Sequence, residues 1–162
     1  MAIQFARARY ISRSTGGSAV RSAAYNERTA ITAERTGELY YFKHRDAPEH
    51  HEVLLPEGAN ARFSDSGVLW NAAEAAERRK DAQVAREIVL ALPSDAGITT
   101  EDRVELARSF AAQHFVAKGL AVQLDMHAPH TASVPRRRLP RSRRPRSRRP
   151  RATRHGHVAP AS

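Results

Sequence analysis

Three side chains suited to a reaction centre stand at defined places in predicted elements. Tyr25 follows Arg21 by one helical turn, and Glu87 opens a strand. His127 follows Asp125 by two positions, on the same face of another strand. A tyrosine hydroxyl can act as a nucleophile, and a histidine with an aspartate can share a metal ion. Taken alone, each fits an ordinary role better: a half-buried aromatic, a solvated strand end and a surface pair.

The elements that must position these residues alternate between strands and helices. After an extended opening, Gly16 and Gly17 interrupt the chain, and Ser18 is placed to cap a short helix over residues 19–25. Strands are predicted at residues 38–43, 52–55, 87–92 and 120–127, and helices at 66–80 and from 99 to 118. His50 and His51 fall in an acidic loop, where we expect them to be solvated.

The two longer helices carry internal signals. The helix over 66–80 places Leu69, Ala72, Ala73 and Ala76 on one stripe, and Trp70 is expected to anchor the core. The second helix begins with Thr99 and Asp102 at capping-box spacing. Its apolar side is predicted to consist of Val104, Ala107, Ala111 and Phe115.

The last strand alternates between apolar and polar residues. One face holds Leu120, Val122, Leu124 and Met126, and the other holds Ala121, Gln123, Asp125 and His127. This alternation predicts a core face covered by helices and a polar face that ends in a histidine. Few, amphipathic strands favour an α+β fold with an antiparallel sheet over a doubly wound fold.

Composition excludes several classes of protein. The 162 residues include no cysteine, which excludes a disulfide scaffold, a zinc ribbon and a cysteine nucleophile. No apolar run is long enough to span a membrane, and the first residues lack a secretory signal, so we expect a cytoplasmic protein. The net charge of +10 comes from residues 131–162, which contain 11 arginines and no acidic residue. Residues 1–130 hold 16 basic and 17 acidic residues.

The Arg/Pro-rich segment 131–162 is predicted to be a disordered basic tail, because it has too few large apolar side chains to form a core. Three interpretations remain open. The segment is a solvated tail without a role, a basic arm that binds phosphates, or an out-of-frame or truncated end. We favour the third interpretation, since a familiar pattern stops where this segment starts.

That pattern covers residues 1–130 and resembles the MobA/MobL relaxases, the plasmid mobilisation family that includes the N-terminal part of TraA-like conjugative proteins. The order and spacing of several segments carry the resemblance: Ser18 to Asn26, Leu54-Leu55-Pro56, Leu69-Trp70-Asn71, Glu77 to Lys80, Gln83 to Ile88 and Leu92-Pro93. The resemblance implies an antiparallel-sheet, HUH-type relaxase fold, incomplete in this chain.

The resemblance also implies an activity and its site. Such relaxases are single-strand endonucleases that nick plasmid DNA at the origin of transfer and form a 5′-phosphotyrosyl link. Tyr25 matches the nucleophile, Glu87 the supporting acidic residue, and His127 the first histidine ligand of a divalent metal of the Mg or Mn class. The expected partners are single-stranded DNA and conjugation accessory proteins. The candidate DNA-binding residues are Arg7, Arg9, Arg13 and Arg21.

The chain departs from the family after His130. A strand beginning with a His-x-His pair should follow, and only His155-Gly156-His157 has that spelling, near the last residue and without a strand pattern. We therefore expect a partial relaxase domain at 1–130 whose catalysis is impaired, because one histidine leaves a metal site short of ligands. The alternatives are a non-catalytic single-stranded-DNA-binding remnant that uses the arginine-rich tail, and a frameshifted product without function.

Overall fold

The computed structural model describes residues 5–43, 46–93 and 95–128. The predictions made for residues 131–162, including the disordered tail and the His155-x-His157 pair, lie outside the described residues. None of the described helices is long and apolar enough to cross a membrane.

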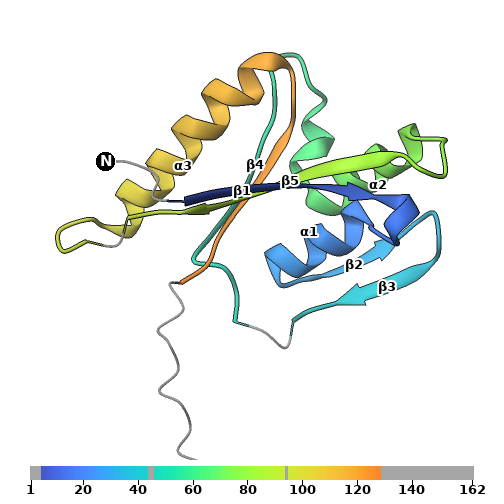
Figure 1. The fold of residues 1–162 in the computed structure, drawn as a ribbon, viewed down its shortest axis with the longest axis horizontal. Coiled ribbons are helices and arrows are strands. Elements are labelled where there is room, and N and C mark those ends of the chain that lie inside the picture. The colour runs from blue at the N-terminus through green and yellow to red at the C-terminus, as the bar shows by residue number, and fades with distance from the viewer. Residues whose placement is uncertain (1–4, 44–45, 94, 129–162) are drawn as a thin grey trace, which may run out of the picture. The chain divides into compact units, whose positions relative to one another are not determined.

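The strands of the described region form three two-stranded sheets, all antiparallel. β1 (Phe5–Ser12) pairs with β5 (Gln83–Ala91), β2 (Ala30–Ala33) with β3 (Glu38–Tyr41), and β4 (His50–Leu54) with β6 (Val122–Met126). Figure 1 shows α1 beside the β2–β3 hairpin and α3 alongside β4 and β6. The predicted antiparallel α+β class is confirmed.

Local capping explains where the three α-helices of the described region begin. Ser18 accepts a hydrogen bond from the Arg21 amide at 3.2 Å and starts α1 (Ala19–Glu27), as predicted. Asp65 caps α2 (Ser66–Ala76). Thr99 and Asp102 form the predicted capping box of α3 (Thr100–His114).

The β1–α1 connection requires a glycine. A Cβ at Gly17 would lie 2.7 Å from the Ser12 carbonyl oxygen, closer than such atoms approach. The interruption predicted at Gly16-Gly17 therefore has a steric basis, since no other residue lets the chain turn from β1 into α1 here.

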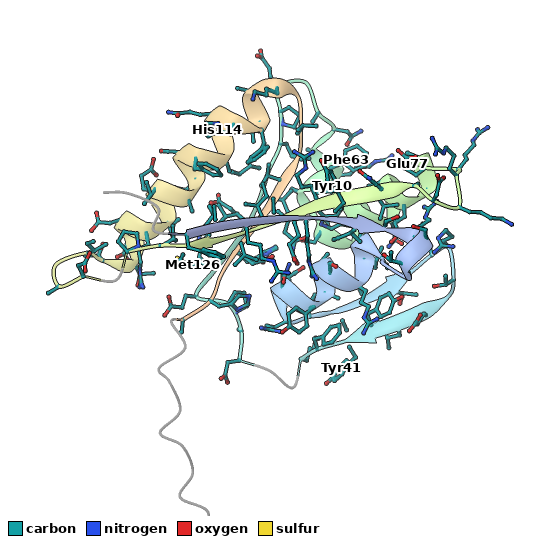
Figure 2. The ribbon with its side chains drawn as sticks, viewed as in Figure 1. Tyr10, Tyr41, Phe63, Glu77, His114 and Met126 are labelled. Atoms are coloured by element: carbon teal, nitrogen blue, oxygen red, sulfur yellow. The ribbon has the colours of Figure 1, made fainter. Side chains whose placement is uncertain are left out.

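The helix predicted over residues 66–80 ends earlier, at Ala76. A side chain from another element holds this helix end and the segment after it, because the Arg13 guanidinium donates to the carbonyl oxygens of Glu74, Glu77 and Arg79. Glu77 has extended backbone angles and lies in the turn that leads to β5 (Figure 2). The charged run 77–80 is therefore exposed turn rather than helix.

Two apolar clusters form the core around α1. One contains Val20, Ala23, Ala24, Ile31 and Ala33, and the other contains Ile11, Ala19, Ala82 and Val84. Trp70 packs against both clusters, which confirms it as a core anchor. On α3, Val104, Ala107 and Ala111 are buried as predicted, whereas Phe115 lies just past the helix end and is half-buried.

The predicted apolar stripe of α2 is not its buried face. The buried residues of this helix are Ser66, Asn71 and Glu74. Asn71 accepts from the Glu34 amide and donates to the Thr32 carbonyl, both at 2.9 Å, and so ties α2 to the β2–β3 hairpin. The stripe prediction was wrong because α2 is attached to its neighbours by polar groups.

Glu74 makes the densest of these polar contacts. Its side chain is 3% exposed, and its Oε1 accepts hydrogen bonds from Ser18 Oγ at 2.7 Å and the Ala19 amide at 2.8 Å. Arg35 Nε donates to Oε2 at 3.3 Å. Burial by itself would raise the pKa of Glu74, but the hydrogen bonds from Ser18, Ala19 and Arg35 outweigh it and hold the pKa below its usual value.

We expect Glu74→Ala to lower the free energy of unfolding by about 3 kcal/mol, because it leaves buried donors without an acceptor. Glu74→Gln should cost less, since it keeps one acceptor oxygen. Glu77→Ala, at the exposed carboxylate that follows α2, should stay within about 0.5 kcal/mol of the wild type. Urea denaturation followed by circular dichroism measures all three, and equal stabilities of the two alanine variants would contradict the role assigned to Glu74.

Acid should destabilise the folded domain through the same carboxylates. The pKa of Glu52 is also lowered, because hydrogen bonds from His50 and Arg108 outweigh its burial. A carboxyl group with a lowered folded pKa adds stability above its unfolded pKa, about 4.3, and loses it as the pH falls through the folded value. We therefore expect the urea midpoint to fall progressively as the pH drops below about 5. The urea midpoint should depend less steeply on pH in Glu74→Gln than in the wild type. An unchanged dependence on pH would contradict the contribution assigned to Glu74.

Candidate functional site

Tyr25 lies near the C-terminal end of α1 with its side chain partly open to solvent, at 40% exposure. The edge of its ring meets Phe42 at a centroid distance of 5.4 Å and an interplanar angle of 85°. The guanidinium carbon of Arg28 lies 4.2 Å from the ring centroid. The phenol is therefore accessible while its ring is held by two neighbours from different segments.

Glu87 lies on β5, directly opposite Arg9 of β1, and the two side chains form an ion pair. Its other oxygen, Oε1, accepts a hydrogen bond from Asn26 Nδ2 at 3.4 Å. Since Asn26 follows Tyr25 in α1, the structure connects the Glu87 carboxylate to the segment that carries the tyrosine. The hydrogen bond to Glu87 raises the pKa of Arg9, so this guanidinium stays charged.

His127 follows the last residue of β6 and is exposed. Asp125, its predicted companion on the strand face, directs its two carboxylate oxygens elsewhere. Oδ1 lies 2.6 Å from His51 Nδ1, and Oδ2 accepts from Gln123 Nε2 at 2.7 Å. The side chain of Asp125 is only 6% exposed, so it is a buried partner of His51.

The prediction that His50 and His51 lie in a solvated loop was wrong. Both belong to β4, where His51 pairs in register with Asp125 and His50 hydrogen-bonds to Glu52 at 3.0 Å. His51 Nε2 also lies 3.4 Å from Ser66 Oγ of α2. β4 begins two residues before the predicted strand because Asp125 of β6 supplies a buried carboxylate to His51. The residues on either side of His51 in the sequence do not reveal this partner.

The polar face of β6 packs against helices. Gln123 accepts from Trp70 Nε1 of α2 at 2.5 Å and donates to the Ala23 carbonyl of α1 at 3.4 Å. The same strand contacts α3 as well. The predicted division of the strand into an apolar and a polar face is present, but α1 and α2 lie on the polar side.

The four candidate DNA-binding arginines have different surroundings. Arg7 and Arg9 on β1 and Arg21 on α1 are exposed. Arg7 and Arg9 line a small hollow of about 70 Å³ together with Glu87 and Val89. The side chain of Arg13 is 9% exposed and donates to three carbonyl groups around the end of α2. Its contacts make Arg13 a structural residue of the α2–β5 turn.

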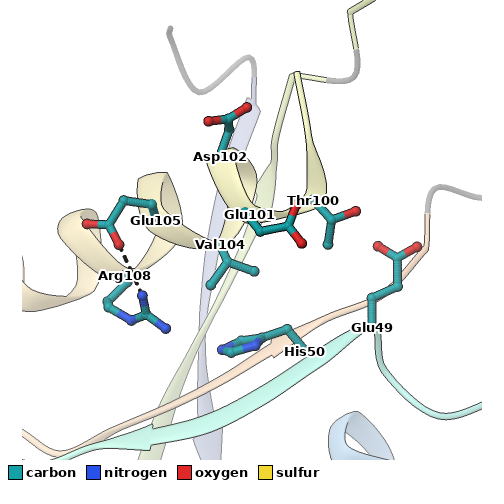
Figure 3. A pocket seen from close by; sticks show the side chains of 8 residues that line it. All are labelled: Glu49, His50, Thr100, Glu101, Asp102, Val104, Glu105 and Arg108. Atoms are coloured by element: carbon teal, nitrogen blue, oxygen red, sulfur yellow. Dashed lines mark hydrogen bonds and ion pairs between the residues drawn. The ribbon is translucent and has the colours of Figure 1, made fainter. Parts of the chain in front are cut away.

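A larger hollow of about 520 Å³ lies between the start of β4 and the N-terminal half of α3 (Figure 3). Its lining includes four carboxylates, those of Glu49, Glu101, Asp102 and Glu105. The residues that line this hollow do not include Tyr25, Glu87 or His127. An acidic lining repels phosphate groups, so this hollow does not suit a nucleic acid backbone.

The described residues do not complete a metal site. Within 5–43, 46–93 and 95–128, no group of three or more His, Cys, Asp or Glu side chains is placed to hold a metal ion. His127 is an exposed imidazole, and the Glu87 carboxylate is occupied by Arg9 and Asn26.

The fold and these residues define the class of protein. The structure is similar, at a TM-score of 0.72 and 31% identity, to a chain solved in a study of vancomycin resistance transfer in Staphylococcus aureus. The match covers 78% of this chain and 63% of the other. The family model of MobA/MobL matches residues 17–158. The chain belongs to the MobA/MobL family, as its sequence pattern predicted.

Curated relatives agree with this assignment. The chain is 38% identical over 133 residues to the mobilization protein MobL of Acidithiobacillus ferridurans, covering 82% of this chain and 34% of MobL. It is 34% identical over 137 residues to the conjugal transfer protein TraA of Agrobacterium fabrum, covering 78% of this chain and 12% of TraA. The chain therefore spans about a third of MobL and about an eighth of TraA.

Proposed function

We propose that this chain carries the nucleophile-bearing part of a single-strand DNA transesterase that acts at a plasmid origin of transfer. The observation that supports it best is the Tyr25 phenol, partly exposed on α1, with its ring held by Phe42 and Arg28. The hydroxyl oxygen of Tyr25 attacks the scissile phosphorus, and the bond to the 3′ oxygen breaks. The phenolic proton is lost, the 3′ oxygen is protonated, and a 5′-phosphotyrosyl ester remains.

This reaction suits a protein that must later rejoin the strand. The link between tyrosine and the 5′ phosphate is itself a phosphodiester. A free 3′-hydroxyl can therefore attack it and rejoin the strand without another energy source. The exposed guanidinium groups of Arg7, Arg9 and Arg21 are the proposed contacts to the phosphates of the strand. We assign Arg13 to structure, on the contacts described above.

Catalysis also depends on a divalent metal in the family's reaction. His127 is the residue proposed to bind this metal here, and a bound ion of the Mg or Mn class would neutralise charge on the phosphate oxygens. The remaining ligands must come from beyond the described residues. The matched range 17–158 includes His155 and His157. If these do not complete the site, the chain is catalytically impaired. Conjugation accessory proteins and a cytoplasmic location belong to the same proposal.

Tyr25→Phe should abolish covalent attachment to a single-stranded origin oligonucleotide, because it removes the attacking oxygen. A labelled oligonucleotide that stays with the protein in a denaturing gel, with Mg²⁺ or Mn²⁺ present, measures the adduct. The matched control is Tyr41→Phe, at another exposed tyrosine, which should leave attachment unchanged. An adduct that persists in Tyr25→Phe would reject the assigned nucleophile.

A second candidate function is non-catalytic binding of single-stranded DNA by the arginine-rich segment. The charge distribution favours it: residues 131–162 hold 11 arginines, whereas residues 1–130 are close to neutral. Binding of this kind needs no nucleophile and no metal, and it is sequence-independent because it is directed at phosphates.

Salt dependence separates the two modes of binding. If all 11 arginines of the segment bind phosphates, the slope of log K against log salt should approach about −8 for a single strand. Contacts from Arg7, Arg9 and Arg21 alone should give a slope of about −2. Fluorescence anisotropy from low to moderate salt measures the slope. A shallow slope would reject the arginine-rich segment as the source of affinity.

A further inference from the structure

Arg28 is the first residue after α1 and has an unusual backbone. Its φ of 61° and ψ of 37° are left-handed, and it is the only non-glycine residue with a positive φ among the described residues. Its amide donates to the Ala24 carbonyl and closes the helix. A side chain with a Cβ is strained in this conformation, in which glycine is favoured. The chain nevertheless has an arginine here.

The side chain of Arg28 is directed at the nucleophile. Its guanidinium carbon lies 4.2 Å from the Tyr25 ring centroid, and Phe42 meets the same ring by its edge. Nη1 of Arg28 is shielded from solvent and has no hydrogen-bond partner among the described residues. A buried donor without an acceptor is unfavourable. Two unfavourable features therefore coincide at the residue that stacks on Tyr25, and such strain commonly marks a functional position.

We propose that Arg28 is a positioning residue for the Tyr25 nucleophile, a role that rests on the proposed function. Stacking of the guanidinium fixes the direction of the phenol, and Phe42 restricts the ring at its edge. The positive charge lies over the ring whose oxygen carries negative charge when the phenol loses its proton for attack, and again when that oxygen leaves phosphorus during rejoining. A partly desolvated cation over an aromatic ring acts more strongly than an exposed one.

A second arginine–tyrosine pair provides a matched comparison. The guanidinium carbon of Arg86 lies 4.7 Å from the Tyr10 ring centroid, and Nη2 of Arg86 donates to the Tyr10 hydroxyl at 2.6 Å. Both residues are exposed, on the β1–β5 pair. Removal of the Arg86 guanidinium should therefore perturb Tyr10 and leave Tyr25 unchanged.

The first experiment detects the contact without requiring activity. The full chain, with its four tyrosines replaced by 3-fluorotyrosine, is examined by ¹⁹F NMR, and Tyr25→Phe assigns the Tyr25 resonance. Arg28→Gln and Arg28→Gly should move the Tyr25 resonance well beyond its linewidth, and Arg86→Gln should move only that of Tyr10. Arg28→Gly relieves the left-handed strain, so it should be at least as stable as the wild type to heat.

The second experiment measures the adduct described above. Arg28→Gln and Arg28→Gly should lower its rate of formation at saturating oligonucleotide by about tenfold. The oligonucleotide concentration for half-maximal rate should stay unchanged, and Arg28→Lys should recover part of the rate.

The outcomes distinguish the inference from the function on which it rests. An unmoved Tyr25 resonance in both Arg28 variants would overturn the positioning role. So would a rate loss that excess oligonucleotide restores, since Arg28 would then be a DNA contact. A wild type that forms no adduct would overturn the proposed function, while the spectra would still decide whether Arg28 holds Tyr25.

Discussion

The carboxylate of Glu74 is the contact on which the arrangement of the site depends. It lies at the N-terminus of α1, where the first amides of a helix lack intrahelical acceptors and the helix dipole favours negative charge. α1 has nine residues, too few for a stable isolated helix. One buried side chain of α2 therefore holds the start of the helix that carries Tyr25.

α2 serves as the attachment point for three other elements. Glu74 holds the start of α1, Asn71 holds the β2–β3 hairpin, and Ser66 lies beside His51 of β4. Apolar packing alone would allow α2 to slide or rotate, because it is non-directional. Hydrogen bonds to buried partners fix one geometry, since any other leaves polar groups unsatisfied. At the far end of α1, Arg28 and Phe42 restrain Tyr25, so both ends of this helix are fixed.

The sequence predicted features that depend on neighbours along the chain. The Ser18 cap, the Thr99–Asp102 capping box and the antiparallel class were all evident from local signals. The early end of α2 and the start of β4 were not, because each is set by a side chain distant in sequence, Arg13 in one case and Asp125 in the other. Glu74 was missed for the same reason: nothing in an Ala- and Glu-rich helix distinguishes the buried carboxylate from the solvated ones.

The local placement of charged side chains matters more here than the net charge. Residues 1–130 are nearly neutral, so the attraction of a DNA strand that we propose for this part cannot come from its net charge. It must come from the local separation of charges, with exposed arginines on β1 and α1 and carboxylates gathered around the hollow by α3. Among these exposed arginines, Arg9 is paired with Glu87, which in turn accepts a hydrogen bond from Asn26 beside Tyr25. A phosphate that binds Arg9 competes with Glu87 for the guanidinium. Under the proposed function, strand binding at β1 and the local environment of Tyr25 would be coupled through this one carboxylate.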